Sequence, residues 1–196
     1  MDDRFDQAIR RIDAANAEDP RTELADGRPQ PRELLFGQRT YAWIPRLLES
    51  PSEALLLATR AHTLRRWMIP RDRYPKTNIG YHEWRDALAR FHADQAADIL
   101  REVGYAEEVI ERVRLLITRQ LWPQDLEARA LEDADCLVFL ETKLAGYIDD
   151  WGEEKTVNIL KGTWGKMTPR ARQYVKRLKM TPREHELLES AVGSSI

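Results

Sequence analysis

Apolar residues along this chain recur at steps of three and four positions, the period of an amphipathic helix. Phe5, Ala8, Ile9, Ile12 and Ala15 form the first such stripe. No segment alternates apolar and polar residues at the period of two that marks a half-buried strand, and no internal repeat is visible. The pattern predicts an all-α fold, a single-domain bundle over residues 1–196 with roughly eight to nine helices.

Capping residues indicate where several of these helices begin. Ser50, Pro51 and Glu53 fit a capping box, with the serine as the cap and the proline at the first helical position. Thr168 and Thr181 each precede a proline, and they predict the starts of two short helices near the C-terminus.

Prolines and glycines mark the connections between helices. The proline-rich stretch 20–31 predicts one loop, and residues 68–80 predict a second, exposed one. A long helix should follow from about Tyr81 to Gly104, because glycine readily takes the left-handed conformation that ends a helix. The helix from about Asp125 contains the apolar run 137–140 and should be the most buried.

Composition indicates the cellular compartment of the protein and the partners that it does not favour. The formal net charge is only −2, although 33% of the residues are charged, so no overall field favours nucleic acid or an anionic membrane. Cys136 is the single cysteine and cannot close an internal disulfide, which fits a reducing compartment. The N-terminal residues are charged and no apolar run is long enough to span a bilayer. We therefore expect a cytoplasmic protein without a membrane or nucleic-acid partner; its oligomeric state is not indicated.

The strongest catalytic motifs are absent. The chain has no phosphate-binding glycine loop, dinucleotide fingerprint, zinc-spaced cysteine pair or nucleophile elbow. The region with the most candidate residues is 62–92. Between Arg65 and Arg90 it contains seven cationic and only three acidic side chains. Guanidinium groups beside an imidazole suit a phosphate or carboxylate ligand, although such arginines can also be solvated or paired within the protein. The predicted ligand-binding side chains are Arg65, Arg66, Arg71, Tyr81, Trp84 and Arg85.

A second candidate region is "LEDADCLVFLE", residues 131–141. Glu132, Asp133 and Asp135 lie at the edge of this apolar helix, and a carboxylate beside a core needs an arginine, a histidine or a metal as a partner. A salt bridge to Arg65 or Arg66 is the simplest interpretation.

His92 lies beside the apolar stripe of the long helix, and two interpretations are open. The ring either fills a gap in the helical core or faces a site. Small residues one turn away leave room beside both His92 and His62. We expect these two histidines to share a cavity with a carboxylate from Asp133 or Asp135, with an arginine at its rim.

Several segments together resemble a known family. "DAANAEDP", "ELLFGQR", "RAHTLRRWMIPRDRYP", "GYHEWRDALARFHADQAADILREVGY" and "LEDADCLVFLE" are similar to a bacterial and fungal family catalogued as domain of unknown function 4202. The similarity covers nearly the whole chain, but the family name implies no activity.

A more distant resemblance, over about residues 62–141, is to the HD-domain superfamily of metal-dependent phosphohydrolases. It implies an HD-like core over about 50–145, with C-terminal helices over 152–192 packed on it. His62 is similar to the first histidine of that family, and Asp135, in "ADCL", to its last aspartate; the family's His-Asp doublet has no counterpart here. The resemblance implies His62, His92 and Asp135 as catalytic residues. It also implies one divalent metal ion, held by His62, His92 and Asp133 or Asp135.

These residues are consistent with three functions. We prefer a His/Arg/Asp pocket that binds a phosphorylated or other anionic small molecule, because the missing doublet weakens the case for a metal reaction. The first alternative is a metal-dependent phosphohydrolase acting on a nucleotide or another small phosphate ester. The second is a non-catalytic interaction protein whose polar residues are structural pairs. The sequence leaves open whether the protein is an enzyme.

Overall fold

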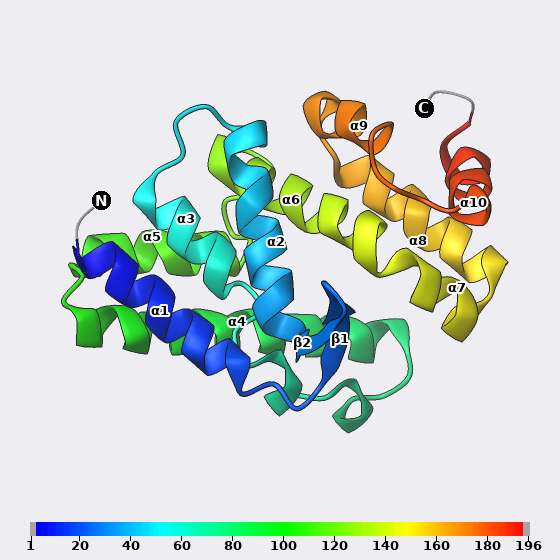
Figure 1. Cartoon of the computed structure of the whole chain (residues 1–196). Helices are drawn as coiled ribbons and strands as arrows, with labels where there is room; N and C mark the ends of the chain where they lie inside the picture. Colours follow the sequence, from blue (N-terminus) through cyan, green and yellow to red (C-terminus); the bar gives the residue numbers. More distant parts are fainter. Residues whose placement is uncertain (1–2, 194–196) are drawn as a thin grey trace.

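Helices make up most of the structure (Figure 1). It is a computed structural model that describes residues 3–193, except for the side chain of Trp151. The all-α prediction is confirmed. The predicted count of eight to nine was too low, since ten α-helices and two 3-10 helices lie in the described range, and α7 had not been expected. The elements are α1 (Asp3–Ala17), β1 (Thr22–Ala25), β2 (Arg28–Pro31), α2 (Arg32–Leu47), α3 (Glu53–Ala61), η1 (Arg66–Met68), η2 (Arg71–Arg73), α4 (Asn78–Val103), α5 (Glu107–Ile117), α6 (Leu126–Thr142), α7 (Leu144–Trp151), α8 (Glu153–Lys166), α9 (Pro169–Val175) and α10 (Pro182–Val192).

A small antiparallel hairpin, β1–β2, occupies the stretch that was predicted to be a loop. Its turn is Asp26-Gly27, and both residues have positive φ, 52° and 73°. An Asp-Gly pair adopts this left-handed turn readily, so it was a signal for a hairpin that the period-two criterion missed. Because β2 leads directly into α2, the hairpin fixes the position of Arg32 in the first turn of that helix.

The start of α3 differs from the prediction by two residues. Ser52, and not Ser50, is the cap, and its hydroxyl accepts a hydrogen bond from the backbone N–H of Leu55 at 3.1 Å. Ser52 offers the same hydroxyl as Ser50 but stands directly before Glu53, so Pro51 stays outside the helix.

The other predicted helix ends agree more closely with the structure. Thr168 and Thr181 cap α9 and α10, as predicted. Gly104 ends α4 with φ of 88°, which an L-residue with a side chain rarely adopts. The same helix starts three residues before Tyr81, because Thr77 caps it.

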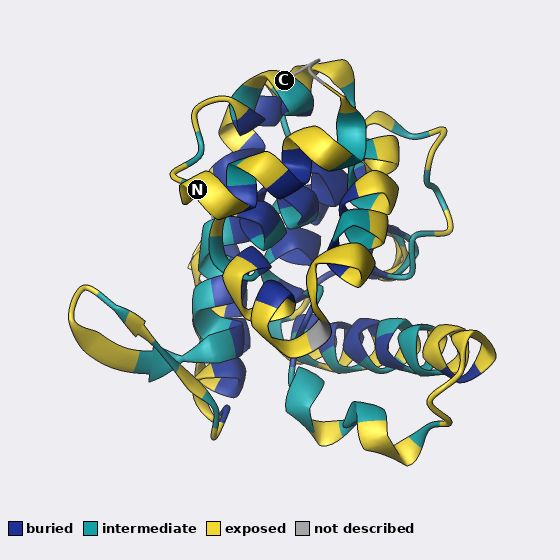
Figure 2. Cartoon of the chain, turned by 90° about the vertical axis from the view of Figure 1, so that its right-hand side faces the viewer, coloured by how far each residue is buried: buried dark blue, intermediate teal, exposed yellow. Residues whose placement is uncertain are grey.

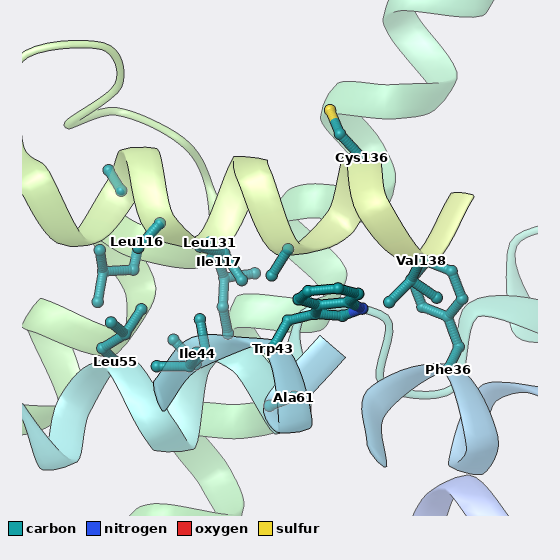
Figure 3. Close-up of a cluster of buried hydrophobic side chains, with 14 of the residues drawn as sticks. Phe36, Trp43, Ile44, Leu55, Ala61, Leu116, Ile117, Leu131, Cys136 and Val138 are labelled. Atoms are coloured by element: carbon teal, nitrogen blue, oxygen red, sulfur yellow. The ribbon is translucent and has the colours of Figure 1, made fainter. Parts of the chain in front are cut away.

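One hydrophobic core connects these helices. Helix α2 packs along α6, α4 packs on α5, and α8 packs on α10. Figure 3 shows Trp43 and Ile44 of α2 lying against α6, with Leu131 and Val138 on the facing side. Full burial of a leucine or isoleucine side chain contributes about 2 kcal/mol, so these contacts are the main source of stability.

Buried positions lie along the inner helix faces, and the hairpin and the segment before α4 project outward (Figure 2). None of the helices in residues 3–193 is both long and apolar enough to cross a membrane.

Candidate functional site

His62 and Asp135 meet between the end of α3 and the middle of α6. The Nε2 atom of His62 lies 3.4 Å from Oδ1 of Asp135. The Nδ1 atom is 2.8 Å from the carbonyl oxygen of Thr59, so Nδ1 carries a hydrogen and donates it. In the neutral ring Nε2 therefore faces the carboxylate without a hydrogen, and the pair becomes an ion pair when the ring is protonated. The structure thus brings together His62 and Asp135, two of the three residues predicted to be catalytic.

Arg119 is the main partner of the acidic edge of α6. Its guanidinium donates to Oδ2 of Asp135 at 2.9 Å and lies 3.2 Å from Oε2 of Glu132. Burial raises the pKa of Asp135, but the contact with His62 and the charge of Arg119 outweigh burial and leave that pKa below its ordinary value. The predicted partners, Arg65 and Arg66, were wrong.

Asp133 lies on a different face of α6. Its Oδ1 accepts from the backbone N–H of Thr168 at 2.8 Å, and its Oδ2 accepts from the hydroxyl of the same threonine at 2.5 Å. Positions two apart on a helix point in nearly opposite directions, since each residue turns the helix by about 100°. Asp133 therefore holds the start of α9 and does not join His62 in one pocket.

His92 is buried, with 2% exposure, between α4 and the turn after α3. Its Nδ1 is 2.7 Å from the carbonyl oxygen of Leu64, whereas Nε2 has no hydrogen-bond partner among the described residues. Burial, together with the smaller effects of the charges of Arg66, His62 and Arg85, lowers the pKa of His92 to about 3, although the hydrogen bond to Leu64 acts in the opposite direction. The ring is therefore neutral at physiological pH, and its hydrogen bond holds the backbone that leads to Arg66.

The four residues predicted to hold a metal ion do not fit one together. Among residues 3–193, no three His, Cys, Asp or Glu side chains are grouped in a way that could hold a metal ion. Asp133 faces α9, and a carboxylate oxygen of Asp135 is bound by Arg119. The side chains of His62, His92, Asp133 and Asp135 therefore do not form one ligand set in the described residues, and a bound metal ion stays a prediction.

Arg66 and Arg85 are two half-buried cations without a carboxylate partner. Arg66 packs over Trp84, with its guanidinium carbon 4.9 Å from the ring centroid. Neither side chain forms a hydrogen bond or ion pair with another residue in the described range. Burial lowers the pKa of Arg66, the charge of Arg85 lowers it further, and the opposing effects of Glu33 and Asp135 are smaller.

The other two arginines predicted to bind the ligand are used by the fold itself. Arg65 donates to the amide oxygen of Gln95 at 2.8 Å. Arg71 donates to the carbonyl oxygens of Tyr74 and Pro75, at 2.9 and 2.8 Å, and so stabilises the turn before α4.

The predicted aromatic residues form one wall next to these cations. Trp84 donates its indole N–H to the carbonyl oxygen of Ile69 at 2.9 Å, which fixes the plane of its ring. The ring of Tyr81 lies 5.9 Å from that of Trp84 and is more exposed.

Lys143 and Arg32 are two further cations of this region, and the sequence analysis did not single them out. The Lys143 ammonium lies 4.9 Å above the ring of Phe36 and 3.9 Å from Oε2 of Glu23. Burial lowers the pKa of Lys143 to about 8, and the charges of Arg32 and Arg66 contribute in the same direction. No local motif marks either residue, since they lie far from 62–92 in the chain. We refer to Arg32, Arg66, Arg85 and Lys143 as the cationic cluster.

A hollow of about 470 Å³ lies beside this cluster, next to the hairpin. Arg32 is the member of the cluster that lines it. The remaining lining residues are Thr22, Glu23, Leu24, Arg39, Glu141 and Thr142.

Comparison with known proteins gives one match. A family model described as "Domain of unknown function (DUF4202)" matches residues 6–188. Searches of curated proteins and of solved structures found no match.

Proposed function

The chain belongs to the DUF4202 family, and we propose that it binds a phosphorylated or other anionic small molecule at the cationic cluster. One observation carries this proposal. Arg66 and Arg85 are half-buried, lie within reach of each other's charge and have no carboxylate partner in the described range. Buried charges in proteins are normally paired, so this arrangement lacks an anion.

A phosphoryl group would supply the missing negative charge. A guanidinium offers parallel N–H donors that match two phosphate oxygens, and it stays charged at all physiological pH values. Trp84 holds the Arg66 guanidinium through a cation–π contact, and the N–H groups of that guanidinium donate to no residue in the described range. The site is therefore ordered before a ligand arrives, which lowers the entropic cost of binding.

The histidines have supporting roles in this proposal. His92 holds the turn before Arg66 through Leu64. His62 contacts Asp135 beside the cluster. Hydrolysis of a phosphate ester stays a prediction. Among the described residues, His62 and Asp135 are not joined by a third side chain that could help them to hold a metal ion.

A binding assay with inorganic phosphate tests the proposal. At constant ionic strength, replacing chloride by phosphate should raise the melting temperature of the wild-type protein, since a ligand that binds the native state stabilises it. Arg66→Met and Arg85→Gln should abolish the increase. Arg90→Gln is the matched control, because Arg90 is exposed on the same helix, α4. An equal phosphate response in all three variants would place the anion elsewhere.

A further inference from the structure

A second pair of cations, Arg32 and Lys143, lies next to Arg66 and Arg85. The ring of Phe36 connects the two parts of the site: its centroid is 5.6 Å from the ring of His62 and 4.9 Å from the ammonium of Lys143. This aromatic ring therefore lies beside both His62 and Lys143.

Arg32 has no carboxylate partner in the described range, although acids surround it. The adjacent Glu33 is taken by Arg21 at 2.9 Å. Glu23, across the hollow, is taken by Arg39 in a short ion pair. Arg32 thus lines the hollow of about 470 Å³ with its charge uncompensated.

Tyr147, on α7, lies within electrostatic reach of members of both pairs. Burial raises the pKa of Tyr147 on this helix, and the charges of Arg66, Arg85 and Arg32 all act to lower it. A single side chain therefore lies within electrostatic reach of three of the four cations. Arg32 also acts on Lys143, so the second pair and the first form one continuous positive region.

We propose that the ligand has two linked anionic groups, one held by Arg66 and Arg85 and the other by Lys143 together with Arg32, which lines the hollow. This inference rests on the proposed anion-binding function and adds the class of ligand, a small molecule with two phosphoryl groups. One phosphoryl group at Arg66 and Arg85 leaves Arg32 without an anion and Lys143 with only the Glu23 carboxylate at 3.9 Å, whereas two phosphoryl groups would serve both pairs. The hollow has the size of a small-molecule site.

Titration calorimetry with three probes tests this inference. The probes are inorganic phosphate, pyrophosphate and the bisphosphate of 1,3-propanediol, all at one ionic strength. We expect the better of the two double anions to bind the wild-type protein at least about tenfold more tightly than phosphate, since an added charge-assisted contact is worth about that factor.

Three variants and one control separate the two ends of the site. Arg32→Gln should remove the advantage of the double anion and leave phosphate affinity unchanged. Arg66→Met should weaken all three probes. Arg28→Gln, on the exposed face of β2, should change none of them. Lys143→Met is a second variant for the same end and should act like Arg32→Gln; circular dichroism and the melting temperature confirm that each variant is folded.

The outcomes distinguish this inference from the proposed function. If phosphate binds and Arg32→Gln and Lys143→Met leave the double anion as tight as before, the second subsite is wrong and the anion site stands. If Arg32→Gln weakens phosphate and double anions by the same factor, there is one anion site and not two. If none of the probes binds the wild-type protein, both proposals fail.

Discussion

Arg119 and Arg66 both carry a partly buried guanidinium within reach of Asp135, but their surroundings differ. Arg119 lies between the carboxylates of Asp135 and Glu132, at 2.9 and 3.2 Å. Arg66 lies over Trp84 and has no acid of its own in residues 3–193. Burial lowers the pKa of both side chains; the charges of Asp135 and Glu132 outweigh it for Arg119, and the pKa of Arg66 stays below the ordinary value.

This difference separates a structural cation from a binding cation. The charge of Arg119 is compensated within the protein, so it stabilises the contact between α5 and α6. The charge of Arg66 is not compensated, and the folded protein bears that cost. Sites that bind ligands often hold such unfavourable arrangements, because the ligand supplies the interaction that the fold lacks.

The largest expected effect on stability is at Arg119, whose charge is compensated within the protein. Arg119→Met removes the main partner of two buried carboxylates and should lower the free energy of unfolding by about 3 kcal/mol at pH 7. Urea denaturation followed by circular dichroism measures it. Adding Asp135→Asn to this variant should restore part of the loss, because one unpaired charge is removed. A loss below about 0.5 kcal/mol would mean that the contacts of Arg119 stabilise the fold no more than a surface ion pair does.

Acid pH should destabilise the folded protein through His92, which is buried in its neutral form beside Arg66. The pKa of His92 is about 3 in the folded protein, well below the value of about 6.5 in an unfolded chain. The unfolded state therefore binds the proton first as the pH falls below about 6.5, so this contribution to stability is full above that pH and is lost below it. It amounts to roughly 2 kcal/mol between pH 7 and pH 5.

His92→Asn isolates this contribution. Asparagine keeps a donor for the Leu64 carbonyl but does not titrate, so the variant should show a flatter dependence of stability on pH. His82→Gln, at an exposed position of α4, should keep the wild-type slope. The same slope in all three proteins would show that His92 is not the group responsible.

Arg66→Met should change the free energy of unfolding in the opposite direction to Arg119→Met. The methionine keeps apolar contact with Trp84 and removes an uncompensated charge, so without phosphate the free energy of unfolding should rise by about 1 kcal/mol. The measurement is denaturation in a chloride buffer. A loss of stability in that buffer would mean that Arg66 has a partner within the fold, and the comparison with Arg119 would fail.

The smallest effect is expected at Arg85. Arg85→Gln should raise the free energy of unfolding by about 0.5 kcal/mol, because it relieves only the repulsion with Arg66 across a partly solvated gap. Arg90→Gln should change stability by less than that. In the background of Arg66→Met the gain from Arg85→Gln should disappear, and a double-mutant cycle measures this coupling.

Parts of the site could be predicted from the sequence. The excess of cations in 62–92 pointed to Arg66, Trp84 and Arg85, which the structure places together. The same reasoning could not distinguish the unpaired arginines, Arg66 and Arg85, from Arg65 and Arg71, since all four lie in one basic segment. The direction of each side chain decides that, and it follows from the left-handed backbone at Arg65, φ 53°, and from the 3-10 turns after it.

What the sequence by itself determined is the helical fold and most helix ends, because the 3.6-residue period, threonine caps and Gly104 act over a few residues. Only the tertiary structure decided which charges are compensated. Arg119 reaches Asp135 from the end of α5, and Arg32 and Lys143 join Arg66 and Arg85 from α2 and the α6–α7 junction. Such pairings join residues far apart in the chain, and packing of the helices sets them, so no local pattern records them.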